Sequence, residues 1–98
     1  MTFSFHRAAK RELDEAVEYY EDCRLGLGYE FHEEIYRTIS RILEYPEAWT
    51  QISPRTRRCL TKRFPYGVIY QIKEDRIRVI AVAHSSRRPR YWSERVED

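Results

Sequence analysis

The sequence contains little glycine, proline or cysteine: its 98 residues include three Gly, four Pro and two Cys. Two cysteines are too few for a disulfide framework, and with three scattered histidines they do not match the ligand spacing of a zinc site. No segment approaches the roughly 20 apolar residues of a membrane span, and the start, MTFSFHRAAKREL, lacks the basic and then apolar pattern of a secretory signal. We therefore expect a cytoplasmic protein without a membrane span, a metal ion or another cofactor.

The remaining composition is that of a small folded domain with unevenly distributed charge. Hydrophobic residues make up 42% and aromatic residues 14% of the chain, which is too apolar for a disordered protein, so we predict one domain over residues 1–98. The net charge is only +2, but residues 1–48 carry six basic and eleven acidic side chains, whereas residues 49–98 carry twelve and five. The basic second half indicates an anionic partner, nucleic acid or an acidic protein, or else a solvated arginine-rich face.

The first half of the sequence has the periodicity of a short strand followed by two helices. Residues 2–6 alternate between apolar and polar side chains, as in a strand. From Ala9 to Tyr20 the apolar residues follow a helical stripe, which the segment RLGLG interrupts because glycine permits a tight reversal. A second stripe begins at Phe31 and ends before Pro46, which cannot continue a helix. These patterns predict two antiparallel helices joined by a short loop.

The second half changes to the alternating pattern of strands. After a loop over residues 46–56, we expect strands over residues 57–64, 68–72 and 77–83, and then a short helix or an ordered tail over residues 84–98. The last strand, IRVIAVA, is apolar on nearly both faces, which is typical of an internal strand covered by helices on one side. The predicted fold class is α+β: an N-terminal short strand and two antiparallel helices packed on one face of a small antiparallel sheet.

Candidate chemistry gathers where the last strand ends. His84 follows that strand directly, and alternation along the strand would place Arg78 on the same face as Ile80, Val82 and His84. A histidine can act as an acid or a base at neutral pH, and arginines beside it could hold a phosphodiester. Alternatively, His84 ends a strand with its ring bonded to the backbone. The basic and aromatic residues that follow it are Arg87, Arg88, Arg90 and Tyr91.

A second basic run precedes the turn between the first two predicted strands of this half. It could follow a phosphate backbone or contact a partner, or it could be a solvated edge strand that discourages pairing with another chain. A DNA-binding helix-turn-helix over residues 8–46 is excluded, because that segment carries five basic and ten acidic side chains and would repel phosphate. The candidate residues for binding nucleic acid or another target are Arg55, Arg57, Arg58, Lys62, Arg78, Arg88 and Arg90.

The order of these motifs resembles that of a known superfamily. The segment RRCLTKRFPYGVIYQIKEDRIRVIAVAHSSRRPRYWSER resembles the C-terminal half of RelE/ParE-superfamily toxins. The segments AAKRELDEAVEYYED and FHEEIYRTISRILEYP, with the GLG turn between them, resemble the paired N-terminal helices of the same toxins. The resemblance extends from about Phe5 to Arg95. It implies a toxin of a type II toxin–antitoxin module, which a small antitoxin neutralises.

The resemblance leaves two toxic mechanisms open. RelE-like members cleave mRNA on the ribosome, whereas ParE-like members generally block DNA gyrase. In the implied nuclease, the histidine is the acid or base, two arginines hold phosphate and a tyrosine stacks a base. RelE carries a pair of lysines on its second strand, and this chain has the single Lys62 there. The residues that match the ribonuclease branch, and are the candidate catalytic residues, are Arg63, His84, Arg87 and Tyr91.

Three functions are therefore consistent with the sequence. The first is a ribosome-dependent mRNA endoribonuclease that blocks translation, and the second is a ParE-like, non-enzymatic inhibitor of DNA gyrase. The third is a non-toxic protein-interaction module whose basic surface binds an acidic chain. For either toxin, we expect a cognate antitoxin whose acidic, partly disordered tail binds the basic surface, and the further partners are ribosome and mRNA or DNA gyrase.

Overall fold

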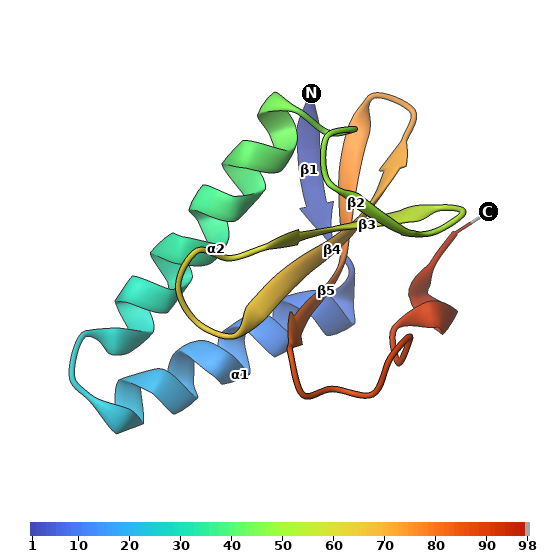
Figure 1. Ribbon diagram of the computed structural model, residues 1–98. Helices are drawn as coiled ribbons and strands as arrows, with labels where there is room; N and C mark the ends of the chain where they lie inside the picture. Colours follow the sequence, from blue (N-terminus) through green and yellow to red (C-terminus); the bar gives the residue numbers. More distant parts are fainter. Residues whose placement is uncertain (98) are drawn as a thin grey trace.

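The computed structural model describes residues 1–97 and packs two helices against a five-stranded sheet (Figure 1). The predicted α+β fold class is confirmed. Within these residues, neither helix is long and apolar enough to cross a membrane. In chain order, the elements are β1 (Thr2–Phe5), α1 (Arg7–Cys23), α2 (Leu27–Glu44), β2 (Thr50–Ser53), β3 (Thr56–Leu60), β4 (Tyr66–Lys73), β5 (Arg76–His84) and the short 3-10 helix η1 (Ser93–Arg95).

The strands of the sheet have the order β1-β5-β4-β3-β2. Strands β2 to β5 pair antiparallel, as expected, but β1 runs parallel to β5, with Phe3 opposite Ile77. The sheet is therefore mixed, because an alternating sequence predicts a strand without predicting its direction. The central strands β4 and β5 are buried along most of their length, which explains their nearly continuous apolar sequences.

The predicted loop over residues 46–56 contains an additional strand, β2. Its residues pair antiparallel with β3, with Gln51 opposite Arg57, and the register shifts before Ser53. The sequence of β2, TQIS, is too short and polar to be recognised from alternation. The hydrogen bonds to β3 define this strand, and such pairing cannot be read from the local pattern.

The strand predicted over residues 57–64 is shorter in the structure, because β3 ends at residue 60. Beyond that point, the backbone N–H groups of Lys62 and Arg63 donate to the carboxylate of Glu34 on α2. Phe64 then adopts a left-handed φ of 73°, and the chain reverses into β4. Arg63 therefore lies in a connection that is bonded to α2, and its predicted position within a strand over residues 57–64 is wrong.

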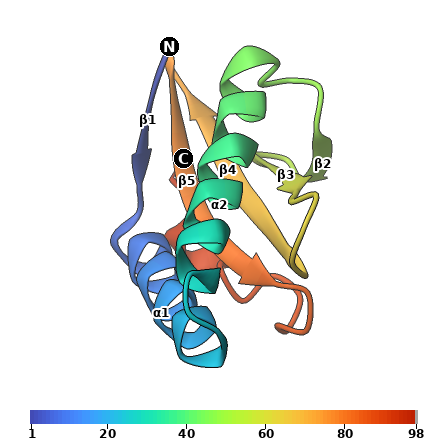
Figure 2. The same cartoon turned by 90° about the vertical axis from the view of Figure 1, so that its left-hand side faces the viewer.

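The main core lies between the helix layer and one face of the sheet (Figure 2). The helical stripes predicted from the sequence are confirmed, since their residues are the ones that face this core. Because both helices cover the same face, the opposite face of the sheet, called the outer face below, is left to other parts of the chain. The buried apolar residues of the helices are Ala9, Leu13, Ala16, Phe31, Ile35, Ile39 and Ile42.

The reversal between the helices depends on two glycines. Gly26 has a φ of 89°, a left-handed conformation that favours glycine. Gly28 lies where α2 approaches α1, and a Cβ there would come within 2.5 Å of the backbone oxygen of Val17. The carboxylate of Glu21 accepts hydrogen bonds from the N–H groups of both glycines, at 2.9 Å and 3.0 Å. The predicted turn is confirmed, and a side chain of α1 holds it.

The C-terminal segment, residues 85–97, covers part of the outer face. Trp92 is 4% exposed and packs with Ile69, Ile80 and Ala81 in a second, smaller apolar cluster. The segment includes η1, so the predicted short helix is confirmed, and residue 98 of that prediction lies outside the described residues. This cover brings the basic end of the sequence across β4 and β5.

Strand β5 contains a bulge at Ile80, which has no partner where its pairing with β4 shifts register. Alternation is interrupted there: Val79 and Val82 both belong to the main core, whereas Ile80 belongs to the cluster on the outer face. The prediction that Arg78 shares a face with Ile80, Val82 and His84 is therefore only partly right: Ile80 lies on the outer face, where Arg78 contacts the C-terminal segment, but Val82 packs in the main core. A one-residue insertion reverses the alternation that follows it, which is why Val82 does not share the face of Ile80.

Candidate functional site

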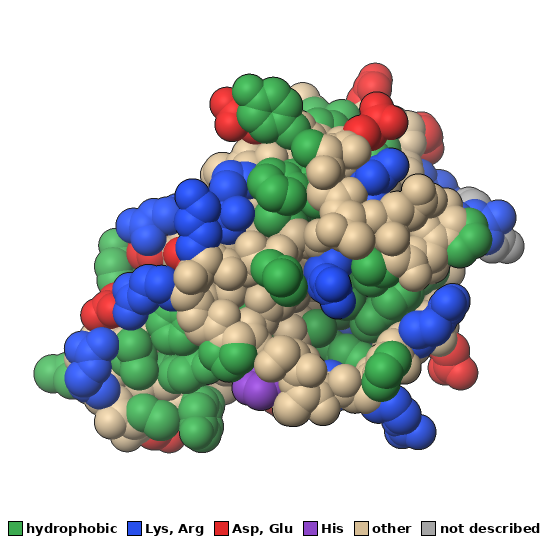
Figure 3. Space-filling view, in the orientation of Figure 1, with side chains coloured by type: hydrophobic (Ala, Val, Ile, Leu, Met, Phe, Trp, Pro, Cys, Tyr) green, Lys and Arg blue, Asp and Glu red, His purple; other side chains and the backbone are tan. Residues whose placement is uncertain are grey.

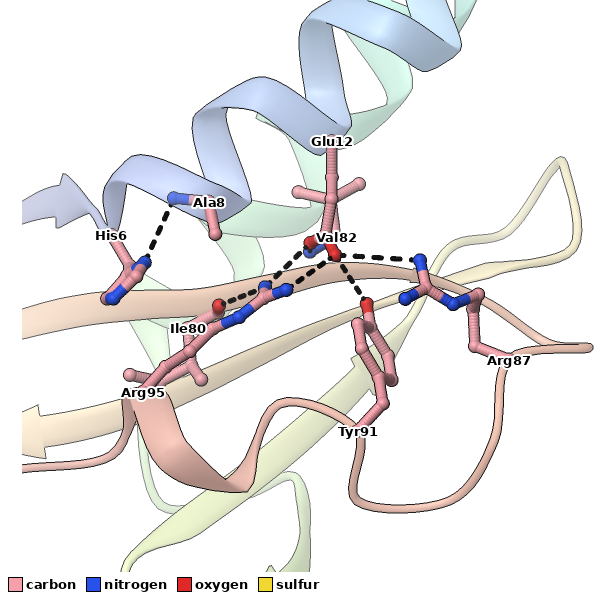
Figure 4. A network of polar contacts seen from close by, with 8 residues as sticks. All are labelled: His6, Ala8, Glu12, Ile80, Val82, Arg87, Tyr91 and Arg95. Atoms are coloured by element: carbon pink, nitrogen blue, oxygen red, sulfur yellow. Dashed lines mark hydrogen bonds and ion pairs between the residues drawn. The ribbon is translucent and has the colours of Figure 1, made fainter.

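Glu12 joins the helix layer, the end of β5 and the C-terminal segment (Figure 4). Its carboxylate accepts hydrogen bonds from the backbone N–H of Val82 at 3.0 Å and from the hydroxyl of Tyr91 at 2.9 Å. Arg95 donates to both carboxylate oxygens, at 3.0 Å and 3.1 Å, and Arg87 forms a longer ion pair at 3.8 Å. The side chain of Glu12 is 13% exposed, so these bonds are largely shielded from water. These five residues are called the Glu12 cluster.

Tyr91, the expected base-stacking residue, is engaged through both its ring and its hydroxyl. The guanidinium carbons of Arg87 and Arg95 lie 3.8 Å and 5.1 Å from its ring centroid. Burial and the hydrogen bond to Glu12 raise the pKa of Tyr91 well above its usual range, so the hydroxyl keeps its proton. A nucleobase stacking on this ring would have to compete with the two arginines.

His84 ends β5, where its ring meets that of Tyr66 edge-on at 5.1 Å. Its Nδ1 accepts a hydrogen bond from the backbone N–H of Ser86 at 3.0 Å and lies 2.8 Å from the Ser86 hydroxyl. A backbone N–H can only donate, so Nδ1 must carry a lone pair, and the proton of the neutral ring is assigned to Nε2. The ring of neutral His84 therefore offers a donor, not an acceptor, at its free nitrogen.

His84 and the C-terminal segment border a pocket of about 300 Å³ on the outer face, called the outer-face pocket. Its apolar lining includes Ile52, Leu60, Ile69 and Trp92. Arginines surround this apolar lining, so the pocket suits an anionic partner that also carries an apolar group. The predicted site residues that line it are Arg58, His84, Arg87, Arg88, Arg90 and Tyr91.

Arg63 does not line the outer-face pocket, although it was predicted to act with His84. Its guanidinium donates to the carboxylate of Glu30 on α2 at 2.9 Å and lies 5.0 Å from the ring centroid of Phe64. The hydrogen bond from Arg63 and the charge of Arg24 lower the pKa of Glu30. Arg63 is thus part of an ion pair on the helix layer.

Other predicted binding residues are engaged in contacts that hold the fold. Arg57 donates to the backbone oxygens of Glu47 and Trp49, at 3.1 Å and 2.8 Å. Arg78 donates to the backbone oxygen of Arg95 at 2.9 Å and pairs with a carboxylate of the C-terminal segment. On the face drawn in Figure 3, several Lys and Arg side chains gather beside α2, and the others are scattered singly across the rest of that face.

Arg55 and Arg57 border a different pocket, of about 480 Å³, together with Tyr70. The Tyr70 hydroxyl donates to the backbone oxygen of Pro46, and burial raises the pKa of Tyr70 to about 12. Neither arginine lines the outer-face pocket. The predicted basic run is therefore divided, because Arg58 belongs to the outer-face pocket and its neighbour in sequence does not.

Residues 3–89 match the family described as the ParE toxin of the type II toxin–antitoxin system parDE. The chain belongs to the ParE toxin family. It is similar in fold to a chain of the solved structure "Chromosomal ParDE TA system from P. aeruginosa", with a TM-score of 0.72 and 16% sequence identity over 86% of this chain and 95% of that chain. No curated protein matches the sequence. Membership in the ParE family makes the protein a toxin of a type II module and implies a cognate antitoxin as its partner.

Sequence reasoning missed three acidic residues of this ParE-family toxin. Glu12, Glu21 and Glu34 are helix carboxylates that accept backbone N–H groups from β5, from the helix reversal and from the β3–β4 connection. Their spacing was a usable signal. Glu12 follows Ala9 by three residues and Glu34 follows Phe31 by three, so each lies beside the apolar stripe and not on the solvent side.

Proposed function

We propose that this ParE-family toxin acts without catalysing a reaction, by binding DNA gyrase and blocking it. The observation that carries the proposal is the hydrogen bond from the Ser86 backbone to Nδ1 of His84. With Nδ1 occupied and Nε2 protonated, the neutral ring has no free lone pair to accept a proton from the 2′-hydroxyl of RNA. His84 is then a hydrogen-bond donor that suits an anionic group of a protein partner.

The positions of two other candidate catalytic residues support the same proposal. Arg63 is paired with Glu30 and does not line the pocket that His84 borders. The hydroxyl of Tyr91 is bonded to Glu12, and arginines lie over its ring. A phosphate clamp and a stacking ring would both have to be released from internal contacts before they could act on RNA.

The proposed target follows from the ParE branch of the superfamily, whose members generally block gyrase. The surface proposed to bind it is the outer-face pocket with the exposed Arg88 and Arg90 beside it. Arginines around an apolar lining would bind an acidic protein surface through charge and burial together. The affinity should therefore fall as the salt concentration rises.

The test is a supercoiling assay with purified toxin and gyrase. We expect wild-type toxin to inhibit supercoiling or to trap cleaved DNA, and Arg88→Ala to weaken the effect. A His84→Ala variant should retain most of the inhibition, because the proposal gives His84 no catalytic step. No effect of wild-type toxin at saturating concentration would contradict the proposal.

Mapping mRNA ends after induction distinguishes the alternatives. New ends in cells with wild-type toxin that disappear with His84→Ala would establish the ribonuclease instead. Harmless overexpression without any antitoxin would favour the non-toxic interaction module. Under our proposal, replication halts before translation and no new ends appear.

We propose further that the antitoxin neutralises the toxin through an acidic, partly disordered tail. The basic residues of the outer-face pocket would supply the complementary charge, and the tail would fold as it binds. The small protein encoded beside the toxin should co-purify with it at moderate salt. Loss of that complex in low salt, where charge attraction is strongest, would contradict this mode of binding.

A further inference from the structure

The arginine loop, residues 85–90, connects the end of β5 to the anchored part of the C-terminal segment. All its side chains are exposed, and within the described residues Arg88 and Arg90 form no ion pair with a carboxylate. Backbone hydrogen bonds shape the loop, among them those from the Arg87 N–H to the His84 oxygen at 3.0 Å and from the Tyr91 N–H to the Arg88 oxygen at 3.3 Å. The loop therefore presents, from a defined backbone, two cations that pair with no carboxylate among residues 1–97.

The backbone of this loop is strained at Arg90, which has a left-handed φ of 63°. Residues other than glycine rarely adopt this conformation, and it persists only where surrounding contacts impose it. The contacts follow directly in the sequence: the Tyr91 hydroxyl donates to Glu12, and Trp92 is buried against Ile69. The strained residue thus lies between the end of a strand and two anchors.

Glu12, on α1, connects this part of the C-terminal segment to the helix layer. Its carboxylate binds Tyr91 and Arg95 of the C-terminal segment and also the backbone N–H of Val82 on β5. Glu12 therefore contacts the chain on both sides of the arginine loop: β5 before it, and the anchored part of the C-terminal segment after it. The ion pair of 3.8 Å between Glu12 and Arg87 adds a contact to a residue of the loop itself.

We infer that Glu12 is a positioning residue for target binding. Through Tyr91 and Arg95 it keeps the arginine loop in the conformation that presents Arg88 and Arg90 to an acidic protein surface. A loop that is ordered before binding loses less conformational freedom in the complex, so its arginines bind more tightly. This inference rests on the proposed function in one respect, namely that the arginine loop contacts the target.

A double-mutant cycle tests whether Glu12 acts through these arginines. We expect Glu12→Gln to raise the toxin concentration for half-inhibition of gyrase about tenfold, and the paired change Arg88→Ala and Arg90→Ala to raise it at least as much. Adding Glu12→Gln to the arginine pair should then cost less than about twofold more. Fully additive effects would overturn the inference, because a merely structural role would weaken both backgrounds equally.

The matched control is Glu15→Gln, one helical turn further along α1. Glu15 is exposed, and the described residues give it no hydrogen bond or ion pair. The Glu15→Gln variant should inhibit gyrase like wild type. An equal loss of inhibition in Glu15→Gln and Glu12→Gln would overturn the specific role of Glu12. The same cycle read as growth arrest decides the role of Glu12 even if wild-type toxin leaves gyrase unaffected, in which case only the proposed target fails.

A second variant keeps the test decisive if Glu12→Gln does not fold. Tyr91→Phe removes only the hydroxyl that Glu12 accepts and leaves the ring beside Arg87. In a Trp49→Phe background, Trp92 is the only tryptophan and reports on the segment. We expect Tyr91→Phe to weaken inhibition severalfold and to shift Trp92 emission to longer wavelength, and unchanged inhibition would overturn the inference.

Discussion

The carboxylate of Glu34 accepts a hydrogen bond of 2.6 Å from the backbone N–H of Lys62, which lies 28 residues later in the chain. The next N–H, that of Arg63, donates to the same oxygen at 3.2 Å. Together these bonds draw the β3–β4 connection onto α2 and bring Arg63 beside Glu30. One buried carboxylate thereby decides on which side of the molecule a candidate catalytic arginine lies.

Replacing this carboxylate should cost substantial stability. Glu34→Ala leaves two backbone N–H groups without their charged acceptor, and we expect the free energy of unfolding to fall by about 2–3 kcal/mol. Urea unfolding of the purified toxin measures the loss. The control is Glu33→Ala, whose exposed ion pair with Arg37 at 3.9 Å should contribute less than about 0.5 kcal/mol. Similar losses in both variants would contradict the role assigned to Glu34.

The two glycines of the helix reversal should respond differently to alanine. Gly28→Ala places a Cβ within 2.5 Å of the Val17 backbone oxygen, which forces the helices apart, and we expect a loss of more than about 2 kcal/mol. Gly26→Ala meets no atom within 4 Å and carries only the left-handed backbone cost, about 1–2 kcal/mol. Thermal unfolding of both variants gives the order, and a milder effect at Gly28 would contradict the close helix contact.

Stability should fall as the pH is lowered because of His6, which caps α1. Its Nδ1 accepts the Ala8 N–H at 2.9 Å, and this requires the neutral ring. Burial, and then the positive charges of Arg78 and Arg95, lower the pKa of His6 below 6.5. A lowered folded-state pKa means that the contribution of His6 is complete above pH 6.5 and is lost as the pH falls through the folded value.

The measurement is urea unfolding of wild type and His6→Asn at pH 7.5 and below pH 6. Asparagine caps a helix without titrating, so the variant should lose less stability over this range than wild type, by up to about 1 kcal/mol. His6→Asn also removes the positive charge that would form beside Arg78 and Arg95. An identical pH dependence in the two proteins would contradict the assignment to His6.

The two thiols should differ in reactivity. Cys59 is buried in the main core, where desolvation raises the pKa of its thiol, whereas Cys23 is exposed at the end of α1. A chromogenic disulfide reagent should therefore modify one thiol rapidly in the native toxin and the second only in urea. Cys23→Ser should remove the rapid phase, and rapid modification of that variant would show that β3 opens readily.

Local pattern in the sequence determined the helices, the central strands and the class of fold. Apolar stripes from Ala9 to Tyr20 and from Phe31 to Leu43 specify which helix faces are buried, because helical periodicity depends only on neighbours a few residues away. The same holds for the arginine loop, whose side chains follow His84 in the chain and necessarily lie near it. The superfamily resemblance rested on such local motifs in their order, and the family match confirms it.

Tertiary contacts decided the rest, because they join residues far apart in the chain. Glu12 accepts a hydrogen bond from Tyr91, which lies 79 residues later, so no local sequence pattern could indicate this contact. The parallel direction of β1 and the bulge at Ile80 depend on pairing between strands, so alternation alone placed Val82 on the face of Arg78, which is wrong. The sequence specified which cations follow the last strand, and packing determined which of them are paired internally and which remain exposed.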